Sequence, residues 1–333
     1  MIKGLFIAMS LVTLTTTCGA ETPAEPPSTN TSPVVPEIAS PGHPNVPAKT
    51  LGGREFWGDV AFCHGWRIQQ NVFTEHFRLL DPSDVRRGWG TCAECETKLE
   101  AERSTRGLKP MSGKAVILIH GIGRSSKSML PLVKPLQEDG YTVVPFDYPS
   151  TRVSIPESAA YLREVVRSLD GIEQIDFVVH SMGGLVVRSL LSDEKPDPRF
   201  RRMVMLGVPN RGAEMASLVE DQPLFRLVYG KAGQQLVRDR EGFIAGLPTP
   251  KFEFAIIAGA RGTEEGFNFL IPGDDDGTVT VASTRLPGAT DFMTVSAIHT
   301  LLMGNPAAIG ATRRFLKQGT LRAEGPREPV AVE

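Results

Sequence analysis

A serine joins an apolar run to a pair of glycines in the stretch Val178-Val179-His180-Ser181-Met182-Gly183-Gly184-Leu185. The residues before it predict a strand, and those after it predict a helix. A serine nucleophile requires such a turn, because its hydroxyl must stand above the edge of a sheet while the next amide faces a developing oxyanion. Gly183 and Gly184 allow the turn to close and the helix to pack tightly behind it. We therefore predict that Ser181 is a nucleophile.

This stretch resembles the nucleophile turn of the α/β-hydrolase family, and within it the bacterial lipases and esterases. The resemblance covers residues 110–318. One position departs from the family pattern G-x-S-x-G, since Val179 stands where the first glycine is usual. Some lipases of this type carry alanine there. We expect the larger valine to strain the packing of the turn without excluding it.

A second motif, Ile119-His120-Gly121-Ile122-Gly123, follows an apolar run. It resembles the His-Gly turn of lipases. The resemblance implies an oxyanion hole formed by the backbone amides of Ile122 and Met182. His120 and Gly121 are then expected beside the substrate, with His120 ordering the loop.

The resemblance also implies the chain order nucleophile, acid, base. Of the six histidines, only His299 follows Ser181, so His299 is the expected base. In the run Asp274-Asp275-Asp276-Gly277, the lipase pattern D-G-x-V selects Asp276 as the acid, and Asp275 is the alternative. A run of aspartates is also typical of a solvated loop or a calcium site, and we expect the two aspartates not used in catalysis to be exposed.

These residues predict a serine hydrolase that cleaves carboxylic esters through an acyl-enzyme. No metal or organic cofactor is required. One alternative keeps the same residues but acts on a thioester, an amide or a glycolipid-anchor ester. Another is an inactive hydrolase-fold binding protein, whose mark would be a missing triad residue. None is missing here.

Short apolar runs rich in valine and isoleucine have the length and composition of buried parallel strands. They are residues 115–119, 141–144, 175–179, 202–206 and 252–257. Amphipathic stretches alternate with them and predict helices at residues 128–139, 156–169, 184–191 and 306–317. This βαβ succession predicts the α/β class, with a doubly wound, mostly parallel sheet as in the α/β-hydrolase fold.

Two further segments accompany this sheet. Residues 207–212 resemble the T-P-x-x-G turn of lipases, with Val208 in place of threonine, and are expected to be structural. Residues 213–247 mix apolar and charged side chains. In this family such an insertion covers the site as a cap or lid, although plain scaffold is the alternative.

A small extension at residues 51–106 contains all three tryptophans and three of the four cysteines. In an exported chain, a disulfide of Cys63 with Cys92 or Cys95 is the first expectation. A zinc site that also uses His64 and unpaired thiols are the alternatives. Residues 65–81 predict a hairpin packed on the hydrolase, with no evident chemical role.

The N-terminus has the order of a secretory signal: Lys3, an apolar stretch at residues 4–14, and small or polar residues 15–20. The apolar stretch is too short for a membrane span. Cleavage after Ala20 would release a soluble protein. Alternatively, Cys18 would be lipidated as in bacterial lipoproteins. We expect export, giving a periplasmic, secreted or membrane-anchored protein.

The composition excludes other classes. The 333 residues carry 36 basic and 38 acidic side chains, for a net charge of −2, so no nucleic-acid partner is expected. An acyl-ester or lipid substrate and a monomer, lipid-anchored or free, are the remaining expectations. The predicted organisation is a signal at 1–20, a proline-rich disordered linker at 21–50, the extension at 51–106, the hydrolase domain at 107–319 and a flexible tail at 320–333.

Overall fold

The computed structural model describes residues 47–50, 52, 55–193, 195–212, 235 and 242–332. The predicted signal, nearly all of the predicted linker and most of the predicted lid lie outside these residues. Within the described ranges, no helix is long and apolar enough to cross a membrane.

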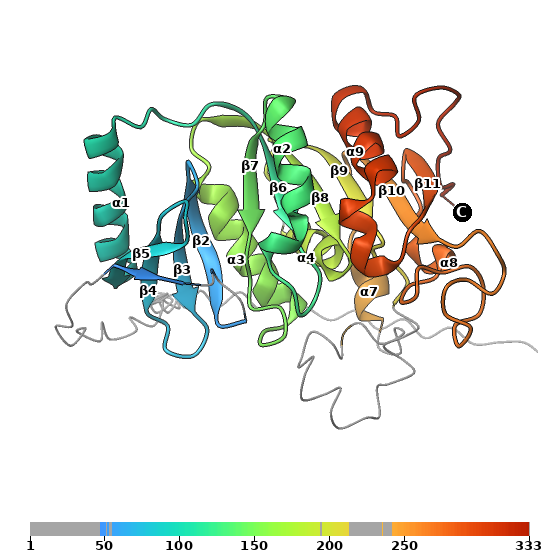
Figure 1. Ribbon diagram of the computed structural model, residues 1–333, viewed down its shortest axis with the longest axis horizontal. Helices are drawn as coiled ribbons and strands as arrows, with labels where there is room; N and C mark the ends of the chain where they lie inside the picture. The colour runs from blue at the N-terminus through green and yellow to red at the C-terminus, as the bar shows by residue number, and fades with distance from the viewer. Residues whose placement is uncertain are drawn as a thin grey trace, which may run out of the picture. The chain divides into compact units, whose positions relative to one another are not determined.

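A six-stranded sheet forms the centre of the described chain (Figure 1). Its strand order is β11-β10-β9-β8-β6-β7, and every neighbouring pair is parallel. The strands are β6 (Gly113–Ile119), β7 (Thr142–Phe146), β8 (Ile172–His180), β9 (Phe200–Leu206), β10 (Glu253–Ala260) and β11 (Asp291–Ser296). The predicted α/β class and doubly wound parallel sheet are confirmed.

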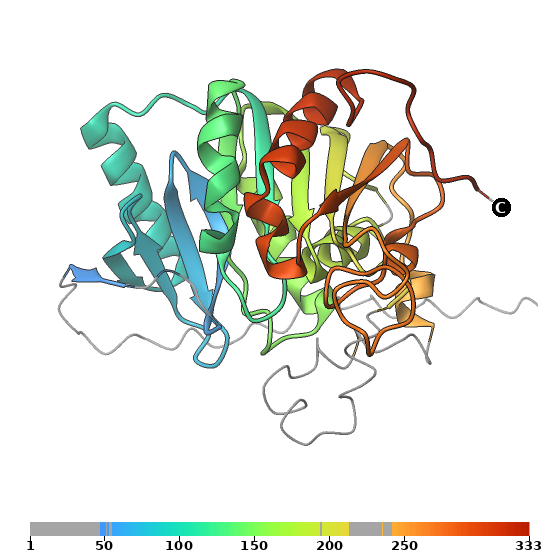
Figure 2. The same cartoon turned by 45° about the vertical axis from the view of Figure 1, so that its right-hand side comes forward.

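Helices cover both faces of this sheet. On one face lie α3 (Ile155–Ser168) and α4 (Met182–Leu190), and on the other α2 (Leu130–Glu138) and α9 (Pro306–Gln318), which lie side by side in Figures 1 and 2. Successive residues of a strand point to opposite faces, so β6 supplies Ile117 to the first core and Leu118 to the second. Short helices complete the fold: η1 (Ser126–Met129), α7 (Phe243–Gly246), α8 (Val281–Thr284) and η2 (His299–Gly304).

The N-terminal extension forms a separate antiparallel sheet in the order β1-β5-β4-β3-β2. Its strands are β1 (Ala48–Lys49), β2 (Trp57–Cys63), β3 (Trp66–Asn71), β4 (Phe77–Leu80) and β5 (Val85–Gly90). Helix α1 (Cys92–Arg106) packs on this sheet through a core of Trp66, Ile68, Leu79 and Cys95. The predicted hairpin is thus the β3–β4 pair of a larger unit, which we call the small sheet.

The predicted disulfide is not formed: Cys63 lies in β2, Cys92 and Cys95 lie in α1, and their thiols are not joined. Cys63 pairs with Trp66 at the β2–β3 turn, and the guanidinium of Arg106 lies 5.1 Å from the centroid of the Trp66 ring. Cys92 and Cys95 belong to the first turn of the same helix. All three thiols are free.

The zinc alternative for the same residues finds no support in this geometry. His64 Nε2 lies 2.8 Å from the carbonyl oxygen of Lys109, away from Cys95. The described part of the chain contains no group of three His, Cys, Asp or Glu side chains placed to hold a metal ion.

The segment predicted as a flexible tail makes specific contacts in the residues described up to 332. Leu321 is fully buried, and its amide donates to Asp291 Oδ2 at 2.7 Å. Further along, the Val330 amide donates to the carbonyl of Ala289 at 2.9 Å, and the Gly288 amide donates to that of Val330 at 3.0 Å. Buried apolar side chains and backbone pairing therefore hold this segment against the region that leads into β11.

Candidate active site

Ser181 occupies the turn between β8 and α4 in a strained backbone conformation, with φ 54° and ψ −130°. A positive φ is costly for a residue with a Cβ atom, and such strain gathers at functional sites. Close packing holds the turn. A Cβ atom on Gly121 would lie 2.9 Å from Cβ of Ser181, and one on Gly183 would lie 2.7 Å from the carbonyl oxygen of Ile119. Only glycine fits at these two positions.

Val179, which departs from the family pattern, lies in β8 beside Met205 of β9. Its side chain is fully buried in the core on the α3–α4 face. The turn thus forms with valine at this position.

His299 contacts both of its expected partners. Its Nε2 lies 3.0 Å from Ser181 Oγ, and its Nδ1 lies 2.7 Å from Asp276 Oδ2. The His299 amide also donates to the carbonyl of Asp276 at 2.7 Å, which fixes the two residues to each other through the main chain. The structure therefore brings together Ser181, His299 and Asp276 from three distant parts of the chain.

The three consecutive aspartates have different partners. Asp276 is 1% exposed, and its second oxygen accepts from the amides of Thr278 and Val279 at 3.1 and 2.8 Å. Asp275 accepts from the amides of Gly277 and Asn268, and burial raises its pKa. Asp275 is therefore a buried turn residue, so the expectation that it is exposed is wrong, and it does not bond to His299.

Two glycines that sequence reasoning did not select for this contact lie against the Asp276–His299 pair. A Cβ atom on Gly207 would lie 3.2 Å from both Asp276 Oδ2 and His299 Nδ1. A Cβ atom on Gly259 would lie 2.7 Å from Cβ of Asp276. Their signal is positional: each lies at the carboxyl end of a strand, β9 or β10, at the edge where the site is built.

His180 is another residue that sequence reasoning did not select. It is 1% exposed, and its Nε2 lies 3.0 Å from the carbonyl oxygen of His299. Burial, with a further contribution from His299, holds the pKa of His180 well below its usual range. The neutral ring therefore donates from Nε2 to the His299 carbonyl and helps to hold His299 in place.

The two amides expected to bind an oxyanion belong to segments that lie next to Ser181. Met182 begins α4, and a first-turn amide has no partner within its own helix and lies at its positive end. Ile122 belongs to the segment from His120 to Ser125, which passes close to Ser181 at Gly121. We call this segment the oxyanion loop.

Hydrogen bonds with residues that follow β7 hold the oxyanion loop in place. Tyr148 donates its hydroxyl to the carbonyl of His120 at 2.7 Å, and the Gly123 amide donates to Ser150 Oγ at 2.9 Å. The ring of His120 is fully buried and stacks on Tyr148 with centroids 4.4 Å apart. Burial lowers the pKa of His120, so the ring is neutral. His120 thus supports the loop from its buried side, while Gly121 is the residue that meets Ser181.

The arrangement can perform nucleophilic catalysis. An imidazole within hydrogen-bond distance of a hydroxyl, and held by a buried carboxylate, can accept the hydroxyl proton and return it later.

Comparisons with known proteins place this chain among familiar folds. Residues 82–235 match a domain of unknown function, DUF7379. No curated protein matches the sequence. The lipase BlEst2 of Bacillus licheniformis in its propeptide form has 21% identity and a TM-score of 0.50, over 66% of this chain and 52% of that one. Its mature form has 21% identity and a TM-score of 0.49, over 62% of this chain and 91% of that one.

A metagenomic carboxyl esterase, MGS0156, has 21% identity and a TM-score of 0.47, over 63% of this chain and 77% of that one. At these identities the similarity concerns the fold. Together with the parallel strand order, the similarity to the propeptide form of BlEst2 identifies the fold of residues 113–318 as that of the α/β-hydrolases.

Proposed function

We propose that this protein, which has the α/β-hydrolase fold, is a serine hydrolase that cleaves carboxylic esters through an acyl-enzyme. One observation carries the proposal: His299 lies between Ser181 Oγ at 3.0 Å and Asp276 Oδ2 at 2.7 Å. The solved structures with similar folds include a lipase and a carboxyl esterase, which favours esters over other acyl compounds.

The proposed mechanism begins with attack of Ser181 Oγ on the ester carbonyl carbon, while His299 Nε2 accepts the hydroxyl proton. Asp276 holds Nδ1–H of the imidazole and stabilises its cationic form. The amides of Ile122 and Met182 donate to the oxyanion of the tetrahedral intermediate, where loss of one donor typically costs about 3 kcal/mol. His299 then protonates the leaving alcohol. Water hydrolyses the acyl-enzyme by the same steps.

Covalent labelling tests this proposal directly. A fluorophosphonate should label the wild-type protein at Ser181, and the Ser181→Ala variant should not be labelled. Ser189→Ala is a matched control, because Ser189 lies in the same helix α4 and should leave labelling unchanged. Labelling that persists in Ser181→Ala, or a wild type that does not react, would exclude the proposed nucleophile.

Hydrolysis of nitrophenyl esters of increasing acyl length, compared with the matching thioesters and anilides, then defines the substrate class. We expect esters to react with the highest kcat/KM. Faster turnover of thioesters or anilides would move the protein to another class of acyl hydrolase.

We also propose that the protein is exported, on the order of charge, apolar stretch and small residues at positions 1–20. Mass spectrometry of the mature N-terminus distinguishes cleavage after Ala20 from a lipidated Cys18. Recovery of the uncleaved N-terminus from cells would contradict export by either route.

A further inference from the structure

The small sheet contacts the segment that holds the oxyanion loop. Asp147 follows β7 and is 2% exposed. Its carboxylate accepts from the amide of Ser126 at 2.7 Å and from Ser126 Oγ at 2.9 Å, at the point where the oxyanion loop ends. The same carboxylate accepts from Nη1 of Arg67 in β3 at 2.8 Å. One buried acid thus joins the small sheet to the end of the loop.

A second contact reaches the middle of the loop. Ser150 Oγ, which accepts from the Gly123 amide at 2.9 Å, donates to Glu55 Oε1 at 3.1 Å. The other carboxylate oxygen of Glu55 accepts from the amide of Thr151 at 3.0 Å and from its hydroxyl. Glu55 precedes β2 and has a φ of 57°, so the chain adopts an unfavourable conformation at the residue that makes these contacts.

Backbone pairing fixes the same junction. The Asp59 amide in β2 donates to the carbonyl of Asp147 at 2.9 Å, and the Asp147 amide donates to Asp59 Oδ2 at 2.7 Å. Asp59 is 2% exposed, as Asp147 is. This junction is therefore built from buried and mutually bonded polar groups, which hold a single geometry because each would be costly to leave unpaired.

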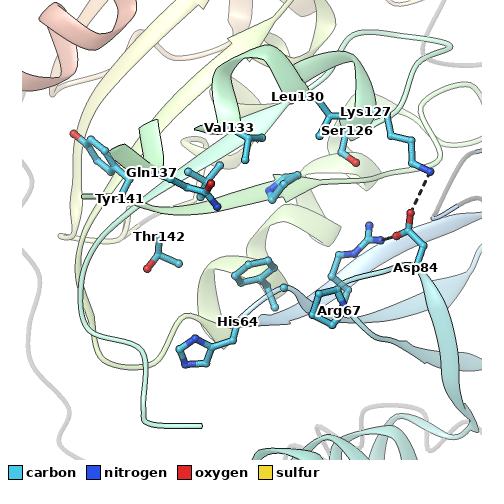
Figure 3. A pocket seen from close by; sticks show the side chains of 15 residues that line it. His64, Arg67, Asp84, Ser126, Lys127, Leu130, Val133, Gln137, Tyr141 and Thr142 are labelled. Carbon is cyan, nitrogen blue, oxygen red and sulfur yellow. Dashed lines mark hydrogen bonds and ion pairs between the residues drawn. The ribbon is translucent and has the colours of Figure 1, made fainter. Parts of the chain in front are cut away.

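A cavity of about 620 Å³ opens beside this junction, between the small sheet and the α2–β7 side of the central sheet (Figure 3). Arg67 and Ser126 line it, and Figure 3 shows Arg67 and Lys127 both directed at Asp84. On this side, space separates the small sheet from α2. Two of its lining residues, Arg67 and Ser126, are joined through the carboxylate of Asp147.

We infer that Glu55 and Arg67 of the small sheet are positioning residues for the oxyanion hole, acting through Ser150 and Asp147 to set the Ile122 amide. This inference rests on the proposed function. It gives a role to an extension for which the sequence suggested none. Neither side chain contacts the substrate in this scheme. Glu55 bonds to Ser150, which bonds to Gly123 of the loop. Arg67 bonds to Asp147, which bonds to Ser126 at the end of the loop.

The test uses Glu55, because removal of Arg67 would leave buried carboxylates unpaired. We expect Glu55→Ala to lower kcat/KM for ester hydrolysis by about 10-fold with little change in KM, since loss of a whole oxyanion donor costs about 10²- to 10³-fold in kcat and a loosened one costs less. Affinity for a trifluoromethyl ketone, which forms an oxyanion on the serine, should fall by the same factor. Glu55→Gln should recover most of both, since its amide oxygen still accepts.

Glu100→Ala is the matched control, because it removes an exposed carboxylate from α1 of the same extension, with a side chain 63% exposed. Its kcat/KM should equal that of wild type. If the Glu55 variants act through Ser150, Glu55→Ala should cost less in a Ser150→Ala background than in wild type. A general loss of folding would instead lower the melting temperature and add fully to the Ser150→Ala effect.

Hydrogen exchange separates this inference from the proposed function. The Gly123 amide should exchange faster in Glu55→Ala than in Glu100→Ala, whatever the protein hydrolyses. An unchanged exchange rate, with kcat/KM within twofold of wild type, would overturn the inference. A wild type without esterase activity whose Gly123 amide still responds to Glu55→Ala would overturn the proposed function alone.

Discussion

At the scale of single residues, three adjacent aspartates have different hydrogen-bond partners. Asp276 directs one oxygen at His299, while Asp275 binds only turn amides in the described residues. Asp274 accepts from the amides of Arg261 and Gly262. Asp276 thus contacts His299, whereas Asp274 and Asp275 bond to backbone amides around it.

These different partners predict opposite effects when Asp276 and Asp275 are each replaced by asparagine. Asp276→Asn should lower kcat by about 10⁴-fold with a small change in melting temperature, because an amide cannot hold the imidazole in the required tautomer. Asp275→Asn should lower the melting temperature and leave most of kcat, because it loses bonds to turn amides. Steady-state kinetics and thermal unfolding of both variants check this. Equal losses of kcat in two well-folded proteins would contradict the assignment of Asp276.

The sequence was sufficient to select Ser181, Asp276 and His299, which the structure brings together, because their expected order follows from a family resemblance and a single histidine follows Ser181. It could not select His180, Gly207 or Gly259 as supports of the site. Their roles depend on which backbone atoms lie within 3–4 Å of them, and that follows from how β8, β9 and β10 align in the sheet. The spacing of residues along the chain does not show which residues of neighbouring strands lie beside each other.

At the scale of elements, the buried strands and most helices were predictable. Strands β6 to β10 are continuous apolar runs, and helix α3 has a capping box formed by Ser154 and Glu157. Strand β11 and helix α1 are among the elements that were not predicted. Strand β11 lies at the edge of the sheet and alternates buried and polar residues only in part. Helix α1 buries a single residue, Cys95, so it shows no apolar stripe.

The contact between β2 and α3 makes a prediction about how the two parts of the molecule pack. A Cβ atom on Gly58 would lie 2.5 Å from the ring of Tyr161. Gly58→Ala should therefore displace the small sheet from α3 and lower the melting temperature, with a cost of about 1–3 kcal/mol typical of overpacking. Calorimetry measures the change.

A compensating substitution provides the control. Tyr161→Leu should restore part of the stability lost in Gly58→Ala, because it removes the ring that the added methyl group meets. An unchanged melting temperature in Gly58→Ala, or no recovery in the double variant, would show that β2 packs on α3 less closely than described.

At the scale of the whole molecule, one buried cation joins segments far apart in the chain. Arg188 of α4 is 2% exposed and donates to the carbonyls of Ile244 and Leu247, at 3.1 and 2.5 Å, and to that of Pro248 at 3.1 Å. It also donates to Asn210 Oδ1 at 3.3 Å. Burial lowers its pKa to about 10, so it stays charged at neutral pH. The helix that begins beside the nucleophile thus anchors both described flanks of residues 213–241.

The positive φ of Ser181 affects how substitutions at this position change the stability of the protein. A positive φ costs a residue with a Cβ atom about 1–3 kcal/mol, and glycine avoids most of that cost. Ser181→Gly should therefore unfold at a higher temperature than Ser181→Ala, although both are inactive. A lower melting temperature for the glycine variant would show that the turn is relaxed. Because of this strain, selection for thermal stability alone would favour loss of Ser181, so the proposed activity and stability oppose each other at this one position.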